Sequence, residues 1–267
     1  MAFRDLFYRS KALDRIYMNV LRPAGYLLLL WPKDYYECLT KKYKYSYLQK
    51  YENIHKGERC FIVGTGPSLK GADLELIKNE IIFGVNALCL WKKFSKNIDY
   101  FFIGDDCAYK RLYNDLPEGT FVANQCIGLV QGEKHIQPLP INRFNSFWPY
   151  SNKKFSLHVD KVIYSFNSVI FLALQMAIYM GFENIYLLGV DCNYHGEKLY
   201  AIDHQIRHQG NYMKDAGQVM IENFMFTKKF LERHKVPVHI FNAADGGMLE
   251  VFPRVHLKEI LSLDNER

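Results

Sequence analysis

The sequence contains no long apolar run. Its longest candidate, Gly25-Tyr-Leu-Leu-Leu-Leu-Trp31, has seven residues, far fewer than the roughly 18 that a membrane-spanning helix needs. The first residues also lack a basic segment followed by an apolar one, which argues against a secretion signal. These absences predict a cytoplasmic protein.

Cysteine is scarce and dispersed. The 6 cysteines have long, irregular spacings, without a Cys-x-x-Cys pair or a cluster of cysteine and histidine. These spacings exclude the common zinc-site patterns and a small disulfide scaffold, so we expect reduced thiols. Hydrophobic residues make up 49% and charged residues 23% of the chain, which excludes a disordered or collagen-like protein.

An excess of one charge sign is confined to the first 57 residues. The net charge is +6, and residues 1–57 hold eleven Lys and Arg against five Asp and Glu, so residues 58–267 are neutral overall. A neutral body without an RNA-binding motif is not expected to bind nucleic acid. The basic and aromatic residues 1–57 suit a segment on the inner face of an anionic membrane. A helical appendage that packs on the core or on a second subunit is the alternative.

Strand and helix patterns alternate after residue 57, in the manner of βαβ units. We therefore predict an α/β fold with a doubly wound, mostly parallel sheet over residues 58–267, preceded by a basic extension of residues 1–57. Residues 125–164 have no clear period and should form loops and short elements. The predicted strands are 60–63, 81–85, 100–103, 120–123, 185–190 and 237–241, and the predicted helices are 72–78, 168–180 and 215–234.

A glycine loop, Gly64-Thr-Gly-Pro-Ser68, follows the first of these strands and precedes a helix. Ligands of open parallel sheets gather at such strand ends, where glycine lets the backbone approach a phosphate and the helix offers free N–H groups. The loop lacks the third glycine of a dinucleotide fingerprint, since Leu69 stands there, and it is not a Walker A loop. A nucleotide site and a tight strand-to-helix turn are both compatible with it.

Three longer segments resemble one bacterial carbohydrate superfamily. Residues 60–86 combine the glycine loop with Asn79-Glu-Ile-Ile-Phe-Gly-Val-Asn86. The second half contains Asn167-Ser168, Met180-Gly-Phe-Glu-Asn-Ile-Tyr-Leu-Leu-Gly-Val-Asp191 and Asn242-Ala-Ala-Asp-Gly-Gly-Met-Leu-Glu-Val-Phe252. The order is similar to that of the sialyltransferases of glycosyltransferase family 42, the motility-associated flagellin glycosyltransferases, and the MptE-like family, which is named for an archaeal 6-hydroxymethylpterin pyrophosphokinase. The resemblance covers residues 60–252 and implies a Rossmann-like, GT-A-type variant.

The resemblance to family 42 implies a site for the nucleotide of a CMP-sugar donor. Thr65 stands where that family usually has Asn, and Asn86 matches an Asn that hydrogen-bonds the donor. Ser168 also suits a helix N-cap, and both roles are compatible. Asp191 ends the central strand and would orient the loop that follows it. The nucleotide-binding positions implied are Gly64, Thr65, Gly66, Ser68, Asn86, Asn167, Ser168 and Asp191.

The catalytic residues implied by family 42 follow the central strand. Tyr194 and Tyr200 lie at, or within one residue of, two tyrosines that support the departing phosphate, a role that needs no metal. The general base would be His208, with His204 as the alternative; a histidine suits proton transfer near neutral pH. His195, His204 and His208 lie within fourteen residues of one another.

The resemblance and the residues quoted for it lead to three hypotheses about function. The first is a metal-independent, cofactor-free glycosyltransferase that moves a sugar, such as sialic acid or a related nonulosonate, from a CMP-sugar donor to a cell-surface glycan hydroxyl. The second is an MptE-like pyrophosphokinase that uses ATP and Mg²⁺ on a pterin alcohol, for which Asp105, Asp106 and Asp191 would supply carboxylates. The third is a non-catalytic nucleotide-binding protein of glycan assembly. The Asp105-Asp106 pair also suits a helix N-cap, Glu250 suits a sugar contact, and the resemblance implies a homo-oligomer.

Overall fold

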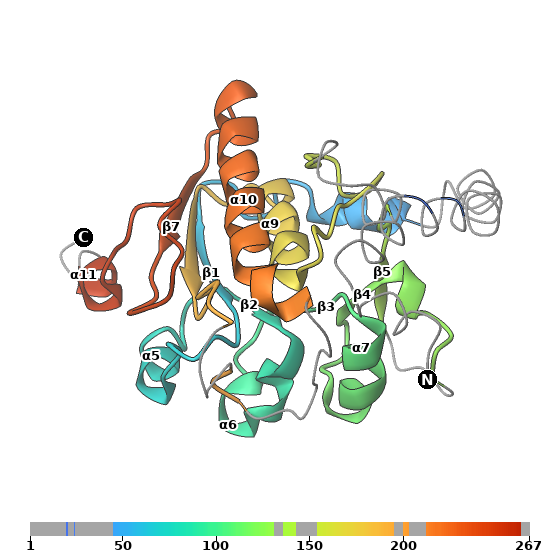
Figure 1. Cartoon of the computed structure of the whole chain (residues 1–267), viewed down its shortest axis with the longest axis horizontal. Helices are drawn as coiled ribbons and strands as arrows, with labels where there is room; N and C mark the ends of the chain where they lie inside the picture. Colours follow the sequence, from blue (N-terminus) through green and yellow to red (C-terminus); the bar gives the residue numbers. More distant parts are fainter. Residues whose placement is uncertain are drawn as a thin grey trace.

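The computed structural model describes residues 45–130, 136–142, 154–194, 200–202 and 212–262, together with residues 20 and 24. Seven strands of this described part form one sheet in the order β5-β4-β3-β2-β1-β6-β7, and every neighbouring pair is parallel (Figure 1). The strands are β1 (Arg59–Val63), β2 (Ile82–Val85), β3 (Tyr100–Ile103), β4 (Phe121–Ala123), β5 (Gln137–Leu139), β6 (Asn184–Leu188) and β7 (His239–Asn242). The predicted Rossmann-like α/β fold is confirmed.

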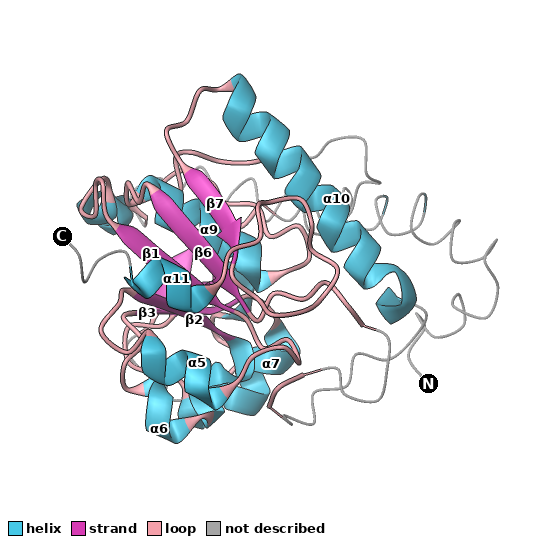
Figure 2. Cartoon of the chain, turned by 90° about the vertical axis from the view of Figure 1, so that its left-hand side faces the viewer, coloured by secondary structure: helices cyan, strands magenta, loops and turns pink. Residues whose placement is uncertain are grey.

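Helices cover both faces of the sheet. Figures 1 and 2 show α5, α6 and α7 together on one side, while α9 and α10 lie next to each other on the other side. The α-helices are α5 (Gly71–Leu76), α6 (Lys92–Ser95), α7 (Asp106–Leu112), α9 (Val169–Tyr179), α10 (Tyr212–Arg233) and α11 (Leu257–Ser262). Short 3₁₀ helices are η3 (Ser46–Tyr51), η4 (Asn86–Leu90), η5 (Tyr113–Asp115) and η6 (Asn124–Cys126).

Helix α9 is the buried helix that the sequence predicted. All of its residues are buried, and it packs against β1, β2 and β3. Its amide residue, Gln175, is fully satisfied, because its side chain donates to the carbonyls of Tyr164 and Phe171 and accepts the N–H of Ser156. A buried helix of this kind is stabilised mainly by apolar contact on every side.

The strand order reverses direction beside β1. The chain proceeds from β1 to β5 toward one edge, and then continues from β6 to β7 toward the other. Strand β1 therefore lies between β2 and β6, and this is the topological switch point at which α/β sheets of this type bind ligands. The loops that follow β1 and β6 meet there.

Residues 45–57 pack on the α/β core. Leu48 is fully buried, and the Tyr47 hydroxyl donates to the Pro138 carbonyl at 2.6 Å. The His55 ring stacks on Phe182 with centroids 4.6 Å apart. The last part of the basic extension thus contributes side chains to the core, while membrane contact by residues 1–57 stays a prediction.

Element boundaries differ from the predicted ones in small, explicable ways. Strand β6 ends at Leu188 rather than at residue 190, because Gly189 adopts φ +63°, a left-handed conformation that breaks an extended strand. Strand β5 is a short element within residues 125–164, and it contains Pro138 at the sheet edge, where proline is tolerated. No helix of the described residues is long and apolar enough to cross a membrane.

Candidate functional site

The glycine loop crosses the end of β6 at very close range. The Gly64 N–H donates to the Leu188 carbonyl and the Gly66 N–H to the Gly189 carbonyl, each at 2.8 Å. A Cβ on Gly64 would lie 2.5 Å from the Gly189 oxygen, and one on Gly66 would lie 2.7 Å from the Asp191 carboxyl carbon. Glycine is required at both positions because any side chain would push the loop off β6.

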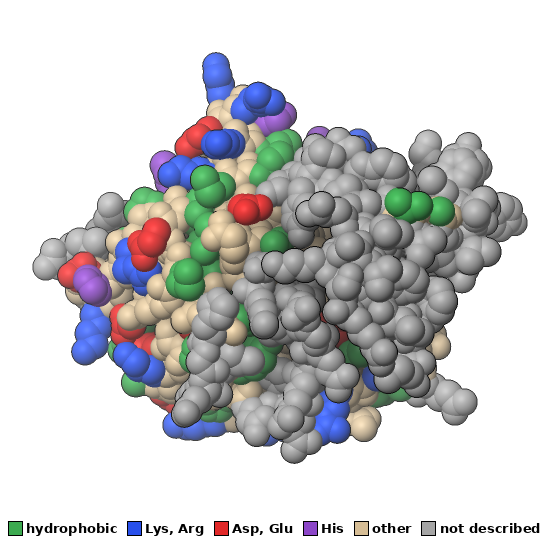
Figure 3. Space-filling view, viewed as in Figure 1, with side chains coloured by type: hydrophobic (Ala, Val, Ile, Leu, Met, Phe, Trp, Pro, Cys, Tyr) green, Lys and Arg blue, Asp and Glu red, His purple; other side chains and the backbone are tan. Residues whose placement is uncertain are grey.

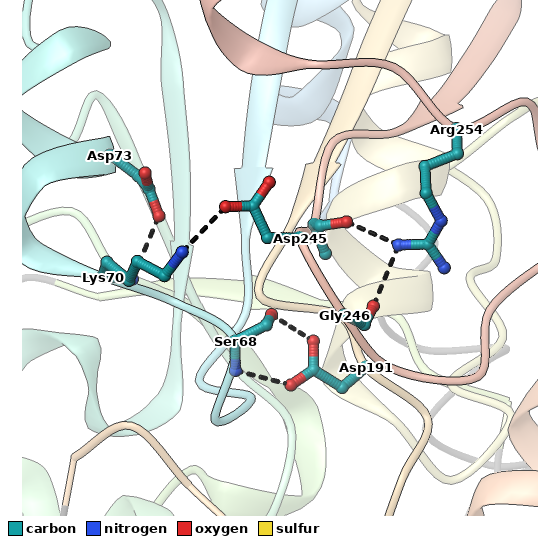
Figure 4. Close-up of polar contacts among 8 residues, drawn as sticks. Ser68, Lys70, Asp73, Asp191, Asp245, Gly246 and Arg254 are labelled. Atoms are coloured by element: carbon teal, nitrogen blue, oxygen red, sulfur yellow. Dashed lines mark hydrogen bonds and ion pairs between the residues drawn. The ribbon is translucent and has the colours of Figure 1, made fainter.

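Asp191 joins three loops at the switch point. Its carboxylate accepts the Ser68 N–H at 2.8 Å through Oδ2 and the Ser68 hydroxyl through Oδ1 (Figure 4). The Met248 N–H donates to the Asp191 carbonyl at 2.7 Å. Gly247, at φ +83°, approaches so closely that a Cβ would lie 2.5 Å from the Asp191 Cα. Asp191 is 4% exposed, so it holds the loops after β1, β6 and β7 together from inside.

The N–H groups of the glycine loop are engaged in hydrogen bonds within the protein. Gly64, Gly66 and Ser68 all donate to acceptors of the protein, and the Leu69 N–H donates to the Gly66 carbonyl at 3.1 Å. The N–H groups of Gly64, Gly66 and Ser68 are therefore engaged within the protein, whereas the sequence analysis expected free N–H groups at the start of the following helix. A ligand of this loop has to be held by side chains and carbonyls, and the nucleotide-binding role itself stays a prediction.

The segment after β6 returns to the glycine loop. The Ala201 N–H donates to the Thr65 carbonyl at 2.9 Å. Tyr200 directly precedes the residue that makes this contact. Burial raises the pKa of Tyr200, so its phenol stays protonated at neutral pH. Tyr194 instead contacts α10, where its hydroxyl lies 3.8 Å from the Met220 sulfur. The backbone next to Tyr200 is thus tied to the loop, and the Tyr194 hydroxyl lies against α10.

Helix α10 packs closely against the start of the same segment. A Cβ on Gly217 would lie 2.1 Å from the Cys192 carbonyl oxygen. Burial, with a smaller contribution from Asp191, raises the pKa of Cys192 to about 12, so this thiol is not a nucleophile near neutral pH. Cys192 is a packing residue between β6 and α10.

Asn86 stands at the end of β2 in a left-handed conformation, with φ 48°. Its side-chain oxygen is buried and has no hydrogen-bond partner among the residues that the structure describes. Asparagine tolerates this conformation better than most residues, so the turn interpretation explains the residue type. The unpartnered oxygen is not explained by the turn.

The Asp105-Asp106 pair follows β3 at the same edge of the sheet. The Asp105 carboxylate accepts the Ala108 N–H at 2.9 Å, which confirms the helix N-cap. Ligand atoms of Asp105, Asp106 and Cys107 all lie within 4.8 Å of one another. The two carboxylates are where Mg²⁺ could bind, since it prefers oxygen ligands.

Asn167 and Ser168 precede α9, whose N-terminus lies at the same edge. The Ser168 hydroxyl accepts the Ile170 N–H at 3.4 Å, which confirms its N-cap role. Asn167 is exposed and adopts φ 61°. Contact with β3 is close, because a Cβ on Gly104 would lie 3.1 Å from Leu172 of α9. Both predicted residues therefore lie at the start of α9, near the end of β3.

A hollow of about 480 Å³ opens beside the glycine loop. Lys70 and Asp245 form an ion pair of 2.8 Å across it. Arg254 donates to the carbonyls of Ala244 and Gly246 (Figure 4) and also pairs with Glu250. The remaining lining residues are Val255 and His256. Donors and acceptors alternate here, an arrangement that suits a hydroxylated ligand.

Sequence analysis had identified only Glu250 in this hollow. Lys70 and Asp245 are 175 positions apart, so no local pattern reports their contact. Lys70 stands two positions after the glycine loop, and Asp245 lies in the segment 242–252 that carries the resemblance. The surface around α11, β7 and the end of α10 carries charges of both signs, interspersed (Figure 3).

The predicted bases His204 and His208 lie outside the described residues, as does His195. Their catalytic role stays a prediction. The described carboxyl edge nevertheless gathers the loops after β1, β2, β3, β6 and β7 with the start of α9, and this is where a substrate of a doubly wound fold is held.

A family model described as "6-hydroxymethylpterin diphosphokinase MptE-like" matches residues 33–197. The chain belongs to the MptE-like family. The matched span of this MptE-like protein includes β1 to β6, with the glycine loop and Asp191, and ends before α10 and β7. One branch of the predicted superfamily is thereby established, while the link to the sialyltransferases of family 42 stays a prediction.

Other comparisons add little to the MptE-like assignment. A search of curated proteins finds no match. Among solved structures, the epimerase Mth375 from the pseudomurein-containing methanogen Methanothermobacter thermautotrophicus is 17% identical over 73% of this chain. The match spans about half of that protein, at 54%, with a TM-score of 0.24. A likeness at this score has no bearing on function.

Proposed function

We propose that this MptE-like protein is a transferase acting on a nucleotide-activated donor, and more narrowly a glycosyltransferase that uses a CMP-sugar. The sugar would be sialic acid or a related nonulosonate, and the acceptor a glycan hydroxyl. The supporting observation is the hydrogen bond between the Ala201 N–H and the Thr65 carbonyl, which ties the segment carrying Tyr200 to the glycine loop at the switch point.

The proposed reaction is a direct displacement. His208, or His204 in its place, takes the proton of the acceptor hydroxyl as the acceptor oxygen attacks the anomeric carbon of the donor. The bond from that carbon to the CMP oxygen breaks, and CMP leaves with the electron pair. Tyr200 donates a hydrogen bond to the departing phosphate, assisted by Tyr194. A phenol, whose ordinary pKa is near 10, is neutral at pH 7 and can donate to the developing phosphate charge.

The hollow lined by Lys70, Asp245 and Arg254 is proposed as the acceptor site. Gly246 borders both the hollow and the glycine loop, since a Cβ on Gly246 would lie 3.7 Å from the Ser68 Cβ. Paired cations and carboxylates offer donors and acceptors to sugar hydroxyls without an excess of either charge. An acceptor held there would lie next to the donor loop.

The family description supports a second candidate, a diphosphokinase that transfers diphosphate from ATP to a pterin alcohol. That chemistry requires Mg²⁺, and Asp105 and Asp106 are the residues that would hold it. One Asp105 oxygen already accepts the N–H of Ala108, which leaves fewer oxygens for a cation. This is the reason for preferring the metal-independent reaction.

A nucleotide binding series on the full chain distinguishes the two. CMP, CDP, UDP and ATP are compared by calorimetry, each with Mg²⁺ and with EDTA. CMP binding that is unchanged by EDTA supports the glycosyltransferase, whereas ATP binding that needs Mg²⁺ supports the diphosphokinase. Absence of binding by every nucleotide would contradict both.

The proposed base is tested with CMP-sugar turnover. His208→Ala should lower the rate by about 10²- to 10⁴-fold, the usual contribution of general acid–base catalysis, while CMP affinity stays the same. His204→Ala is the matched control on the same segment. A larger loss in His204→Ala than in His208→Ala would exchange the two roles.

A further inference from the structure

Three buried side-chain atoms lack a hydrogen-bond partner in the described part of the chain: the oxygens of Asn86 and Asn124 and the hydroxyl of Tyr179. An unsatisfied buried polar atom costs roughly 1–3 kcal/mol, and native structures keep few of them without a reason. Tyr179 ends α9, at the edge where the strands begin, since its carbonyl accepts the Asn53 N–H. The two asparagines lie at the opposite edge, where ligands bind.

The register of β3 and β4 fixes the position of Asn124 at that edge. It directly follows β4, and the pairing of Ile103 with Val122 puts Asn124 level with Asp105 on the neighbouring strand. Asn86 directly follows β2. Adjacent strands lie about 4.8 Å apart, so the ends of β2 and β4 stand roughly 10 Å from each other, on either side of the end of β3.

The chemistry of these groups restricts what could bind. An amide oxygen accepts hydrogen bonds and repels phosphate oxygens, and the carboxylate of Asp105 at the same level adds negative charge. A ligand group that satisfies Asn124 must therefore carry N–H or O–H donors. Because an asparagine amide also donates through Nδ2, it complements an exocyclic amine beside a ring nitrogen, as in cytosine or adenine.

We propose that Asn124 contacts the base of the bound nucleotide. The inference rests on the proposed function, because it takes the ligand of this edge to be a nucleotide. Asn124 as a whole is only partly buried, so a rotation of its amide brings the oxygen to the ligand. Asn86 was already expected to contact the donor, whereas nothing in the sequence pointed to Asn124.

The test uses Asn124→Leu in the full chain. Leucine has nearly the same shape and removes the unsatisfied oxygen, so the unfolding midpoint should stay the same or rise. CMP affinity, measured by calorimetry, should fall about tenfold, and a preference for CMP over UMP should shrink. Tyr179→Phe is the matched control, since it also removes an unsatisfied atom but lies at the opposite edge, and its CMP affinity should equal that of the wild type.

The possible outcomes are distinct. Equal CMP affinity in Asn124→Leu and wild type would overturn the base contact and leave the proposed function intact. A wild type that binds no nucleotide would overturn both. If Asn124→Leu does not fold, Asn124→Asp replaces it; this variant keeps an acceptor but loses the Nδ2 donor, and CMP binding as tight as in the wild type would again overturn the contact.

Discussion

Asp191 shows how one residue can organise the switch point. Its two carboxylate oxygens accept the N–H and hydroxyl of Ser68, and its carbonyl accepts the N–H of Met248. The sequence predicted that Asp191 ends the central strand and orients the loop that follows; β6 ends three residues earlier, at Leu188. The identity of the partners depends on the meeting of β1 and β6, which only the fold provides.

The first prediction concerns Asp191→Ala. The variant leaves the partly buried Ser68 N–H without its acceptor, so the free energy of unfolding should fall by about 1–3 kcal/mol. Urea unfolding followed by circular dichroism measures this loss. Asp245→Ala is the matched control in the same cluster; it removes an exposed ion pair with Lys70, and such pairs contribute little. Equal losses in the two variants would contradict the role assigned to Asp191.

At the scale of elements, continuous apolar runs in the sequence predicted the bounds of strands and helices best. Strands β1, β3 and β6 and helix α9 agree with their predicted segments to within two residues. Short elements were predicted only in part: β4 and α5 were expected, whereas β5, with three residues, and α11, with six, were not, because so few residues show no clear period. In these elements, tertiary contacts decide the conformation.

Some residues of the candidate site could be predicted from the sequence, and others could not. Residue types at strand ends indicated the glycine loop, Asn86 and Asp191. The pairing of Lys70 with Asp245 and the unpartnered oxygen of Asn124 could not be predicted. Both features depend on how segments that are far apart in the chain come together in the fold.

The glycine loop leads to a prediction about packing. Gly66→Ala should destabilise the protein by about 1–3 kcal/mol, the usual cost of overpacking, because its Cβ would lie 2.7 Å from Asp191 and from the Gly189 oxygen. CMP binding should weaken as the loop shifts. Gly246→Ala is the control on the facing loop, since its Cβ would touch only Ser68 at 3.7 Å. Thermal unfolding of both variants is measured, and a Gly66→Ala protein as stable as Gly246→Ala would refute the packing argument.

For the whole molecule, buried tyrosine phenols make the free energy of unfolding depend on pH at high pH. Burial, the largest cause in each case, raises the pKa of Tyr100 and of Tyr179 to about 12, and it also raises the pKa of Tyr47. In the unfolded chain these phenols ionise near pH 10. The stability that depends on the neutral phenols is therefore fully present below pH 10, and it is lost as pH rises from about 10 toward about 12.

The free energy of unfolding should accordingly decline between pH 10 and pH 12. Tyr100→Phe should flatten this decline, because the variant has one fewer phenol that ionises only on unfolding. The loss per phenol should be smaller than the full linkage value, since Tyr100 is only half-buried and water screens it. Denaturant unfolding at several pH values, with tyrosinate absorbance as a second signal, provides the measurement. An unchanged slope in Tyr100→Phe would exclude Tyr100 as a contributor.

The pairing of β1 with β6 has a consequence for how the protein is made. Arg59 pairs with Asn184, so β1 emerges from the ribosome long before the neighbour that covers its second edge. Until β6 arrives, the nascent chain carries the middle strand of its sheet with one side open, and such an edge invites pairing with other chains. Growing cells would therefore need to shield this intermediate, and ribosome-bound chains that stop before β6 should be the ones that chaperones retain.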